Sequence, residues 1–250
     1  MDMKSSVKSA DRALDLFEAF GDMKRPLSLS ELADRINTPA SSCHGLVRTL
    51  RQRGYLYDVG RRLLYPTRRI LDVARAIVEN DPVLERIEPA LQRLRDGSRE
   101  TIILGARQND AVVYLAVVEG QHTVRYTARP GERKPLHSSA IGKALLGALD
   151  DSALEQLLSK LALPAVTENT LTDPAALAAD IRQGREKGFF VTRGENVADV
   201  MAAATTVTLN NEPYGIAIAG PVHRMEPLID DYGAELLKVR DGITARERAA

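Results

Sequence analysis

The chain has 250 residues, 44% of them hydrophobic, and its 34 basic and 34 acidic residues give no formal net charge. This apolar content argues against a disordered chain, the single cysteine (Cys43) excludes an intramolecular disulfide, and no apolar run is long enough for a membrane span. The first 15 residues also lack the apolar run of a signal peptide, so we expect a cytoplasmic protein without a membrane partner.

The first predicted elements are two short helices. Apolar residues at positions 13, 14, 16, 17 and 20 are spaced as on one face of a helix, which we expect to end at Gly21. The pattern Ser28-x-x-Glu31 is a capping box, in which each side chain satisfies a backbone N–H at the start of a helix. It predicts a second helix that runs through Ile36.

A third helix and a β-hairpin are predicted to follow. Thr38 can cap a helix and Pro39 suits its first turn, whereas Gly54 is a natural stop at its C-terminal end. Two short apolar runs then flank a basic turn within residues 55–65, as in a hairpin. Three helices and a hairpin predict an α+β winged helix-turn-helix domain over residues 1–66.

The rest of the chain is predicted to form a linker helix (residues 67–81) and a second α+β domain (residues 82–250). In the second domain, helices and strands follow one another without clean βαβ alternation. Helices are expected at 83–94, 137–149, 153–161, 174–187 and 227–239, and strands at 101–118 (with a turn at 108–110), 124–128, 189–192, 201–209 and 214–219.

Charge is distributed unevenly between the two predicted domains. Residues 1–75 carry 14 basic and 9 acidic residues, a net of +5, and the remaining residues carry 20 and 25, a net of −5. Between Arg48 and Arg69, seven arginines accompany one acid, Asp58. Such an asymmetry indicates a nucleic-acid partner.

The third helix has the pattern of a DNA-reading helix. Cys43, Leu46 and Val47 share one side, which we expect to pack inward, and a stripe of small and polar residues occupies the other. Such residues can approach base edges in the major groove, and arginines at a hairpin tip suit phosphate contact or minor-groove insertion. The predicted DNA-contacting residues are Ser41, Ser42, His44, Gly45, Arg48, Thr49, Arg51, Arg61 and Arg62.

Other interpretations of this region stay open. A short two-helix turn with a basic hairpin also occurs in protein-interaction modules, so a ligand-sensing module without specific DNA binding is the alternative function. His44 is either a base contact or a solvated surface residue, and Cys43 is either a small core residue or a redox sensor.

An enzyme is not expected. The run His137-Ser138-Ser139 contains a candidate nucleophile, but no G-x-S-x-G frame surrounds it, and serines at a helix start are more simply caps. The sequence contains no P-loop, no G-x-G-x-x-G and no Cys/His cluster, so we predict no catalytic residue, no metal and no cofactor.

Several motifs, in order along nearly the whole chain, resemble the IclR family of transcriptional regulators. They include Arg12-Ala13-Leu14-Asp15, Leu27-Ser28-Leu29-Ser30-Glu31-Leu32-Ala33 and Arg53-Gly54-Tyr55-Leu56, and Pro135-Leu136-His137-Ser138-Ser139-Ala140-Ile141-Gly142-Lys143-Ala144-Leu145-Leu146 in the second domain. The resemblance implies a winged helix-turn-helix, a linker helix and a GAF-like effector-binding domain. It also implies a repressor or dual regulator of a catabolic operon. Such a regulator would be a homodimer or homotetramer that binds a double-stranded, pseudo-palindromic DNA operator, and a small organic effector would control this binding.

The sequence departs from the family at the implied effector site. Ala140 and Ile141 stand where relatives that bind small oxo-acids begin a helix with Gly-Ala, and Ala217 and Ala219 replace two serines. Lost hydroxyls would leave polar groups of such an acid unpaired, so we expect a less polar, aromatic effector, or a vestigial pocket filled by side chains. The implied effector-binding residues are Ala140, Ile141, Thr192, Met201, Thr205, Ala217 and Ala219, with Thr205, Thr206, Arg125 or His223 as polar anchors.

Overall fold

The computed structural model describes residues 7–249, and side chains as far as residue 247. The chain divides into two compact units, Met1–Asp81 and Pro82–Ala250, and each has a hydrophobic core of its own. Residues 1–6 and residue 250 lie outside the described residues. Two expectations include residues 1–6: the start of the first domain and the absence of a signal peptide.

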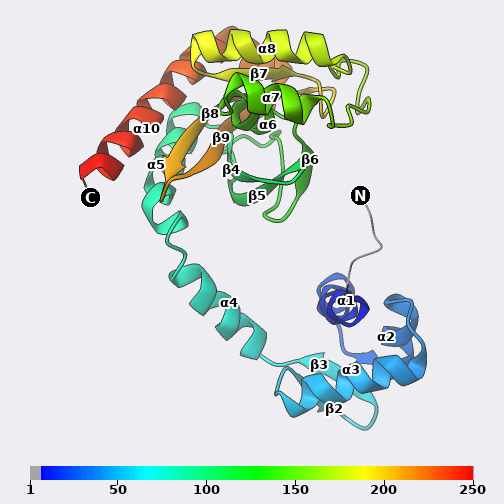
Figure 1. Ribbon diagram of the computed structural model, residues 1–250. Coiled ribbons are helices and arrows are strands. Elements are labelled where there is room, and N and C mark those ends of the chain that lie inside the picture. Colours follow the sequence, from blue (N-terminus) through cyan, green and yellow to red (C-terminus); the bar gives the residue numbers. More distant parts are fainter. Residues whose placement is uncertain (1–6, 250) are drawn as a thin grey trace. The chain divides into compact units, whose positions relative to one another are not determined.

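The N-terminal unit is a helical domain with a small antiparallel sheet, in which the third strand lies between the other two (Figure 1). Leu16, Leu32 and Leu56 are among the buried side chains that join the helices to this sheet. The predicted winged helix-turn-helix is confirmed. Its elements are α1 (Lys8–Met23), β1 (Leu27–Ser28), α2 (Leu29–Arg35), α3 (Ala40–Gln52), β2 (Leu56–Val59) and β3 (Leu63–Pro66). The N-terminal unit also contains α4 (Arg69–Glu79), a helix within the segment predicted to be the linker.

Two helix ends differ from the sequence-based expectation. Helix α1 passes through Gly21 and ends at Met23, because Lys24 adopts a left-handed backbone (φ 52°) that closes the last turn with a bond to Phe20. Helix α3 starts after Pro39, which occupies the N-cap position, so the expected side-chain cap by Thr38 is wrong. At the other end of α3, Gly54 has a φ of +76°, as its predicted stop requires.

The C-terminal unit is built on one antiparallel sheet of strand order β6-β5-β4-β9-β8-β7. The expected turn between the first two long strands is confirmed, and another tight turn uses Asn210 and Asn211 with positive φ. The elements are α5 (Leu84–Ser98), β4 (Thr101–Gln108), β5 (Ala111–Val118), β6 (Arg133–Pro135), α6 (Ala140–Gly147), α7 (Asp151–Leu158), α8 (Pro174–Lys187), β7 (Phe190–Arg193), β8 (Val200–Leu209), β9 (Glu212–Pro221), α9 (Val222–Met225), a 3-10 turn (Glu226–Leu228) and α10 (Ile229–Ala249).

Helices cover both faces of this sheet. One core cluster lies on the side of α6, α7 and α8, and a second lies on the side of α5 and α10 (Figure 1). Because successive residues of a strand point to opposite faces, neighbours such as Met201 and Ala202 belong to different clusters. This alternation decides which strand residues can reach a cavity on either face.

One expectation for this unit is wrong, and one strand was not expected. Residues 124–128 form no strand, and the carbonyl of Tyr126 accepts a hydrogen bond from the hydroxyl of Thr101 instead of joining the ladder. The short strand β6 instead pairs with the start of β5. It was not expected, because three residues carry too little periodicity to be recognised.

Candidate DNA interface and effector cavity

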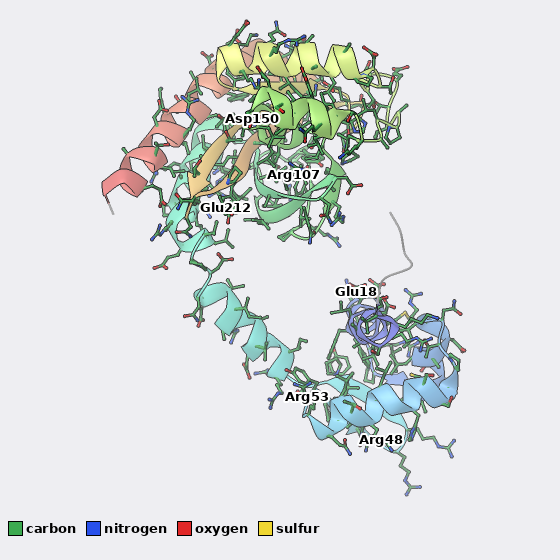
Figure 2. The ribbon with its side chains drawn as sticks, in the orientation of Figure 1. Glu18, Arg48, Arg53, Arg107, Asp150 and Glu212 are labelled. Carbon is green, nitrogen blue, oxygen red and sulfur yellow. The ribbon has the colours of Figure 1, made fainter. Side chains whose placement is uncertain are left out.

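The outer side of α3 carries the predicted polar stripe. Ser41, His44 and Arg48 are exposed, and Figure 2 labels Arg48 on this outer side. Cys43 and Val47 are buried on the inner side, as expected from their spacing. Ser42 and Gly45 are half-buried between the two sides. The stripe therefore presents small and polar groups along one accessible face.

Cys43 is a core residue. Its side chain is fully buried, and its thiol lies 3.9 Å from the carbonyl oxygen of Leu29 on α2. Burial raises the pKa of this thiol, which opposes formation of the thiolate that redox chemistry needs. Of the two interpretations of Cys43, the structure favours the small core residue.

An open groove of about 680 Å³ lies between the start of α2, helix α3 and the β2–β3 hairpin, which we call the wing. Five of the nine predicted DNA-contacting residues line it: His44, Arg48, Arg51, Arg61 and Arg62. We call this surface the arginine groove. Its other lining residues are Ser28, Leu29, Ser30, Val47, Asp58 and Leu64.

Two of the predicted DNA-contacting residues already have partners within the unit. The hydroxyl of Thr49 donates to the carbonyl of Gly45 at 3.0 Å, one turn back in the same helix. The guanidinium of Arg51 forms an ion pair with Asp58 on β2. Sequence reasoning missed this pair, and it did not place Ser28 and Ser30 at the groove, because both depend on how α2, α3 and the wing pack together.

The capping box fixes the start of α2 beside the groove. Glu31 accepts the backbone N–H of Ser28 at 2.7 Å and also pairs with Arg25 at 2.8 Å. These two interactions lower the pKa of Glu31 to about 2. Ser28 in turn accepts the N–H of Glu31, so the predicted capping box is confirmed.

The C-terminal unit contains a small cavity of about 40 Å³ between the sheet and α6, which we call the inner cavity. Five of the seven implied effector-binding residues line it: Ala140, Ile141, Thr192, Ala217 and Ala219. The remaining walls are Ile103, Tyr114, Tyr126, Ser138, Ser139, Asn196, Val197, Val200 and Ala202.

Met201 and Thr205 are wrongly placed by sequence reasoning. Met201 is fully buried in the core cluster on the opposite face of the sheet, and the hydroxyl of Thr205 donates to the carbonyl of Gly188 at 2.9 Å. Strand alternation places Ala202, which pairs with Ala219, at the cavity instead. An error of one residue in a strand moves a side chain to the other face.

Helix α6 begins at the wall of the inner cavity. The side chain of Ser139 caps the helix by accepting the N–H of Gly142 at 3.1 Å, and its hydroxyl donates to the carbonyl of Pro135 at 2.9 Å. The first N–H groups of a helix have no intrahelical acceptor, so those of Ala140 and Ile141 offer donors at the cavity wall. Such a wall suits an anionic group.

The polar side chains at the inner cavity are those of Tyr114, Tyr126, Ser138, Ser139, Thr192 and Asn196. The amide of Asn196 donates to the hydroxyl of Ser138 at 3.0 Å. Burial raises the pKa of Tyr114, and the neighbouring Tyr126 adds to the effect, so the Tyr114 phenol stays neutral. Alanines 202, 217 and 219 line the sheet side and contribute only methyl groups. The cavity therefore combines a polar end with apolar walls.

A buried ion-pair network supports this site from behind. Lys143 on α6 is fully buried, and its ammonium lies 2.7 Å from Glu195 and 2.9 Å from Asp180 on α8. Burial raises the pKa of Glu195, although the charge of Lys143 opposes this shift. Because Glu195 precedes Asn196, the network ties α6 and α8 to the loop that forms one wall of the inner cavity.

An open groove of about 850 Å³ lies outside the inner cavity. The two spaces share three wall residues: Tyr126, Val197 and Val200. Arg125 and His223, two of the polar anchors considered from sequence, line this outer groove and not the inner cavity. The third candidate, Thr206, lines neither space.

Two further features bear on the kind of protein. Within residues 7–249, no group of three or more His, Cys, Asp or Glu side chains is arranged to hold a metal ion. Over the same residues, no helix combines the length and apolarity that crossing a bilayer requires.

Comparison with known proteins agrees over nearly the whole chain. Residues 9–60 match the family described as "IclR helix-turn-helix domain", and residues 75–243 match "Bacterial transcriptional regulator IclR C-terminal". The chain is 32% identical to the HTH-type transcriptional regulator BhcR of Paracoccus denitrificans, over 88% of this chain and 79% of that protein. It is 28% identical to the transcriptional repressor IclR of Escherichia coli, over 95% and 89% of the two chains.

Solved structures share the fold. The IclR of Thermotoga maritima superposes with a TM-score of 0.81 at 21% identity, over 95% of this chain and 98% of that one. An IclR homologue from Microbacterium hydrocarbonoxydans, solved with 4-hydroxybenzoate, has a TM-score of 0.75 at 23% identity, over 97% and 100%. The relatives are named as regulators of transcription and not as enzymes. The chain belongs to the IclR family of bacterial transcriptional regulators.

Proposed function

We propose that this regulator binds operator DNA through the outer side of α3 and the arginine groove, and that a small aromatic acid bound in its C-terminal unit modulates this binding. The observation that carries the DNA-binding surface is the convergence of Arg48, Arg61 and Arg62 on one groove beside an exposed polar helix face. Base edges would be read from Ser41, His44 and Arg48, and phosphates would be held by the wing. Such a regulator acts where the chromosome is, in the cytoplasm.

The DNA-binding proposal is tested by fluorescence anisotropy on duplexes from upstream of the regulator's own gene, over a series of salt concentrations. Phosphate contacts release counterions, so affinity should fall steeply as salt rises, and a preferred sequence should stand out above random DNA. Binding to no duplex at low salt would favour the alternative, a ligand-sensing module that acts on protein partners.

We propose that the regulator reads a pseudo-palindrome as a symmetric dimer. The support is α4, where the apolar residues Ile70, Leu71, Ile77 and Val78 are between 39% and 66% exposed and recur on one face of the helix. A second copy of this chain can cover that face through an isologous contact. A homotetramer, the other assembly that the family resemblance implies, would need a further contact surface in addition to α4.

Sedimentation velocity tests this assembly. Ile77→Glu places a charge in the apolar face and should shift the protein toward monomer, whereas Arg75→Glu, a charged substitution at another exposed position of α4, should not. Equal sedimentation of wild type and Ile77→Glu would contradict a dimer through α4.

The effector proposal rests on the walls of the inner cavity. Helix N–H groups at Ala140 and Ile141 suit a carboxylate, and the alanine wall offers no hydroxyl to a compact oxo-acid. The IclR homologue that was solved with 4-hydroxybenzoate supports an aromatic acid as the class of effector. A space of about 40 Å³ holds only a few water molecules, so an aromatic ring requires movement of the shared wall at Tyr126 and Val197.

Isothermal titration calorimetry against benzoates and against short oxo-acids tests the effector class. We expect benzoates to bind, and Ala217→Leu to abolish their binding by filling the cavity. Ala179→Leu makes the same change at an exposed position of α8 and should leave binding intact. Tight binding of pyruvate or glyoxylate would contradict the aromatic class, and no binding by either class would favour a vestigial pocket.

A further inference from the structure

Over the described part of the chain, Asp58 is the one acid that lines the arginine groove. It lies on β2 of the wing, among four arginines that come from α3 and from the hairpin turn. An acid facing the polyanion that such a groove would bind works against affinity, because like charges repel. Its presence there therefore calls for a reason other than attraction to DNA.

Asp58 forms an ion pair with Arg51, and the pair bridges the last turn of α3 and the wing. Among the residues that the structure describes, Arg51 is the one arginine of this groove in an ion pair. The two side chains are 49% and 47% exposed, and pairs this exposed contribute little to folding stability. The main effect of the pair is thus on the charge that the groove presents to a ligand.

A carboxylate and a phosphate bind a guanidinium in the same way, through charge-assisted hydrogen bonds to oxygen. The carboxylate of Asp58 consequently binds the guanidinium of Arg51 in the place that a DNA phosphate would take. Arg51 also lies in the last turn of α3, whereas a recognition helix contacts bases mainly from its N-terminal residues. A released Arg51 is therefore placed to add a phosphate contact and no sequence information.

We propose that Asp58 is a specificity-determining residue that acts as an internal substitute for phosphate. By holding Arg51, it lowers the affinity of the regulator for DNA of arbitrary sequence. This inference rests on the proposed DNA-binding function. It also changes the role predicted for Arg51, which is held by Asp58 and does not contact a DNA phosphate in the wild-type protein.

The effect differs between operator and random DNA. On random DNA all affinity comes from phosphates, and the protein can shift its register until a phosphate meets a released Arg51. On the operator, base contacts from the N-terminal half of α3 fix the register, so the phosphate positions are fixed as well. Removal of Asp58 therefore strengthens random binding more than operator binding.

Anisotropy titrations of the full-length protein test this proposal, with a 30-base-pair random duplex and with an operator duplex selected by the wild-type protein. For Asp58→Asn we expect random-duplex affinity to rise about three- to tenfold near 0.1 M salt, and the salt slope to steepen by about 0.9, as one added phosphate contact requires. Operator affinity should rise less, so the ratio of operator to random affinity should fall.

Two further variants separate the pair from simple charge. Arg51→Gln/Asp58→Asn keeps the wild-type net charge and should restore wild-type affinity and slope. Asp22→Asn is the control, because Asp22 forms another exposed ion pair of the same unit, with Arg35, outside the groove. This variant should change neither the affinity for random DNA nor the salt slope. Thermal melts should be unchanged for all of these variants, since both pairs are exposed.

The outcomes are decisive in each direction. Unchanged or weaker random binding by Asp58→Asn overturns the proposal, and so does tightening that persists in the double variant, since Asp58 would then not act through Arg51. Equal tightening on operator and random DNA also overturns it, because specificity would not change. If the wild-type protein binds no duplex, the proposed function itself fails, which is a separate result.

Discussion

The two candidate sites of this regulator differ in how they are built. The arginine groove is open, and its charged side chains come from one helix and one hairpin close together in the sequence. The inner cavity is much smaller, and its walls come from β4, β5, α6, β7, β8 and β9, which together span residues 101–221. We infer that substitutions in the groove change DNA binding with little effect on folding, whereas substitutions in the packed layer behind the cavity change folding first.

The largest effect is expected at Lys143, behind the inner cavity. Lys143→Met leaves the buried carboxylate of Glu195 without its cation, and breaking such a pair costs about 3–5 kcal/mol, part of which Glu195 can recover by binding a proton. Urea denaturation followed by circular dichroism measures the loss. Lys238→Met removes an exposed pairing lysine and is the control. Equal stability of the two variants would contradict a structural role for the network.

A smaller loss is expected at Gly142, at the start of α6. A Cβ added there would lie 2.1 Å from the carbonyl oxygen of Leu136, so Gly142→Ala must shift the backbone, at a cost of about 1–3 kcal/mol. Gly97→Ala is the matched control, because nothing lies within 4 Å of an added Cβ at this exposed position of α5. It should stabilise the helix by up to about 1 kcal/mol, so calorimetric melts should move in opposite directions.

At the groove, Arg48→Ala should leave folding unchanged and weaken operator binding. Loss of an arginine contact to a base edge costs about 1–3 kcal/mol of discrimination, so base preference at one operator position should relax as well. Anisotropy with operator variants measures both effects, and Arg35→Ala, on α2 outside the groove, serves as control. Unchanged operator affinity would show that the proposed reading face of α3 is misplaced.

The smallest effect is expected from acid. The pKa of Glu31 is lowered from 4.5 to about 2 by its bonds to Ser28 and Arg25. The folded protein thus holds this carboxylate ionised more strongly than the unfolded chain does. The resulting stability is present above pH 4.5 and is lost as the pH falls toward 2. The wild-type protein should show this loss, whereas Glu31→Gln should show a smaller acid dependence in melts between pH 5 and 2.5.

The comparison of the two sites also explains what sequence could predict. Local signals sufficed for the N-terminal unit, where the Ser28–Glu31 capping box, Gly54 and the hairpin each act within a few residues. The ion pair between Arg51 and Asp58 escaped prediction because it depends on the packing of the wing against α3.

At the inner cavity, four of the five lining residues named from sequence were tied to a motif or to a long strand, and the fifth, Thr192, lies on the short strand β7. Ala140 and Ile141 follow the serine cap of α6, and Ala217 and Ala219 share one face of β9. Met201 failed by one residue, because the loop before β8 gives no signal that fixes the strand register. The network around Lys143 was missed because its partners lie 37 and 52 residues away.

The salt dependence of operator binding tests the central claim most directly. Wild type and an Arg61→Ala/Arg62→Ala variant are titrated with the same selected operator and with a random duplex, between about 50 and 200 mM salt. If the wing binds phosphates, the variant should lose affinity for operator and random DNA alike, and its salt slope should be shallower by about 1.8, or about 0.9 for each lost contact. An unchanged slope and affinity would contradict DNA binding through the arginine groove.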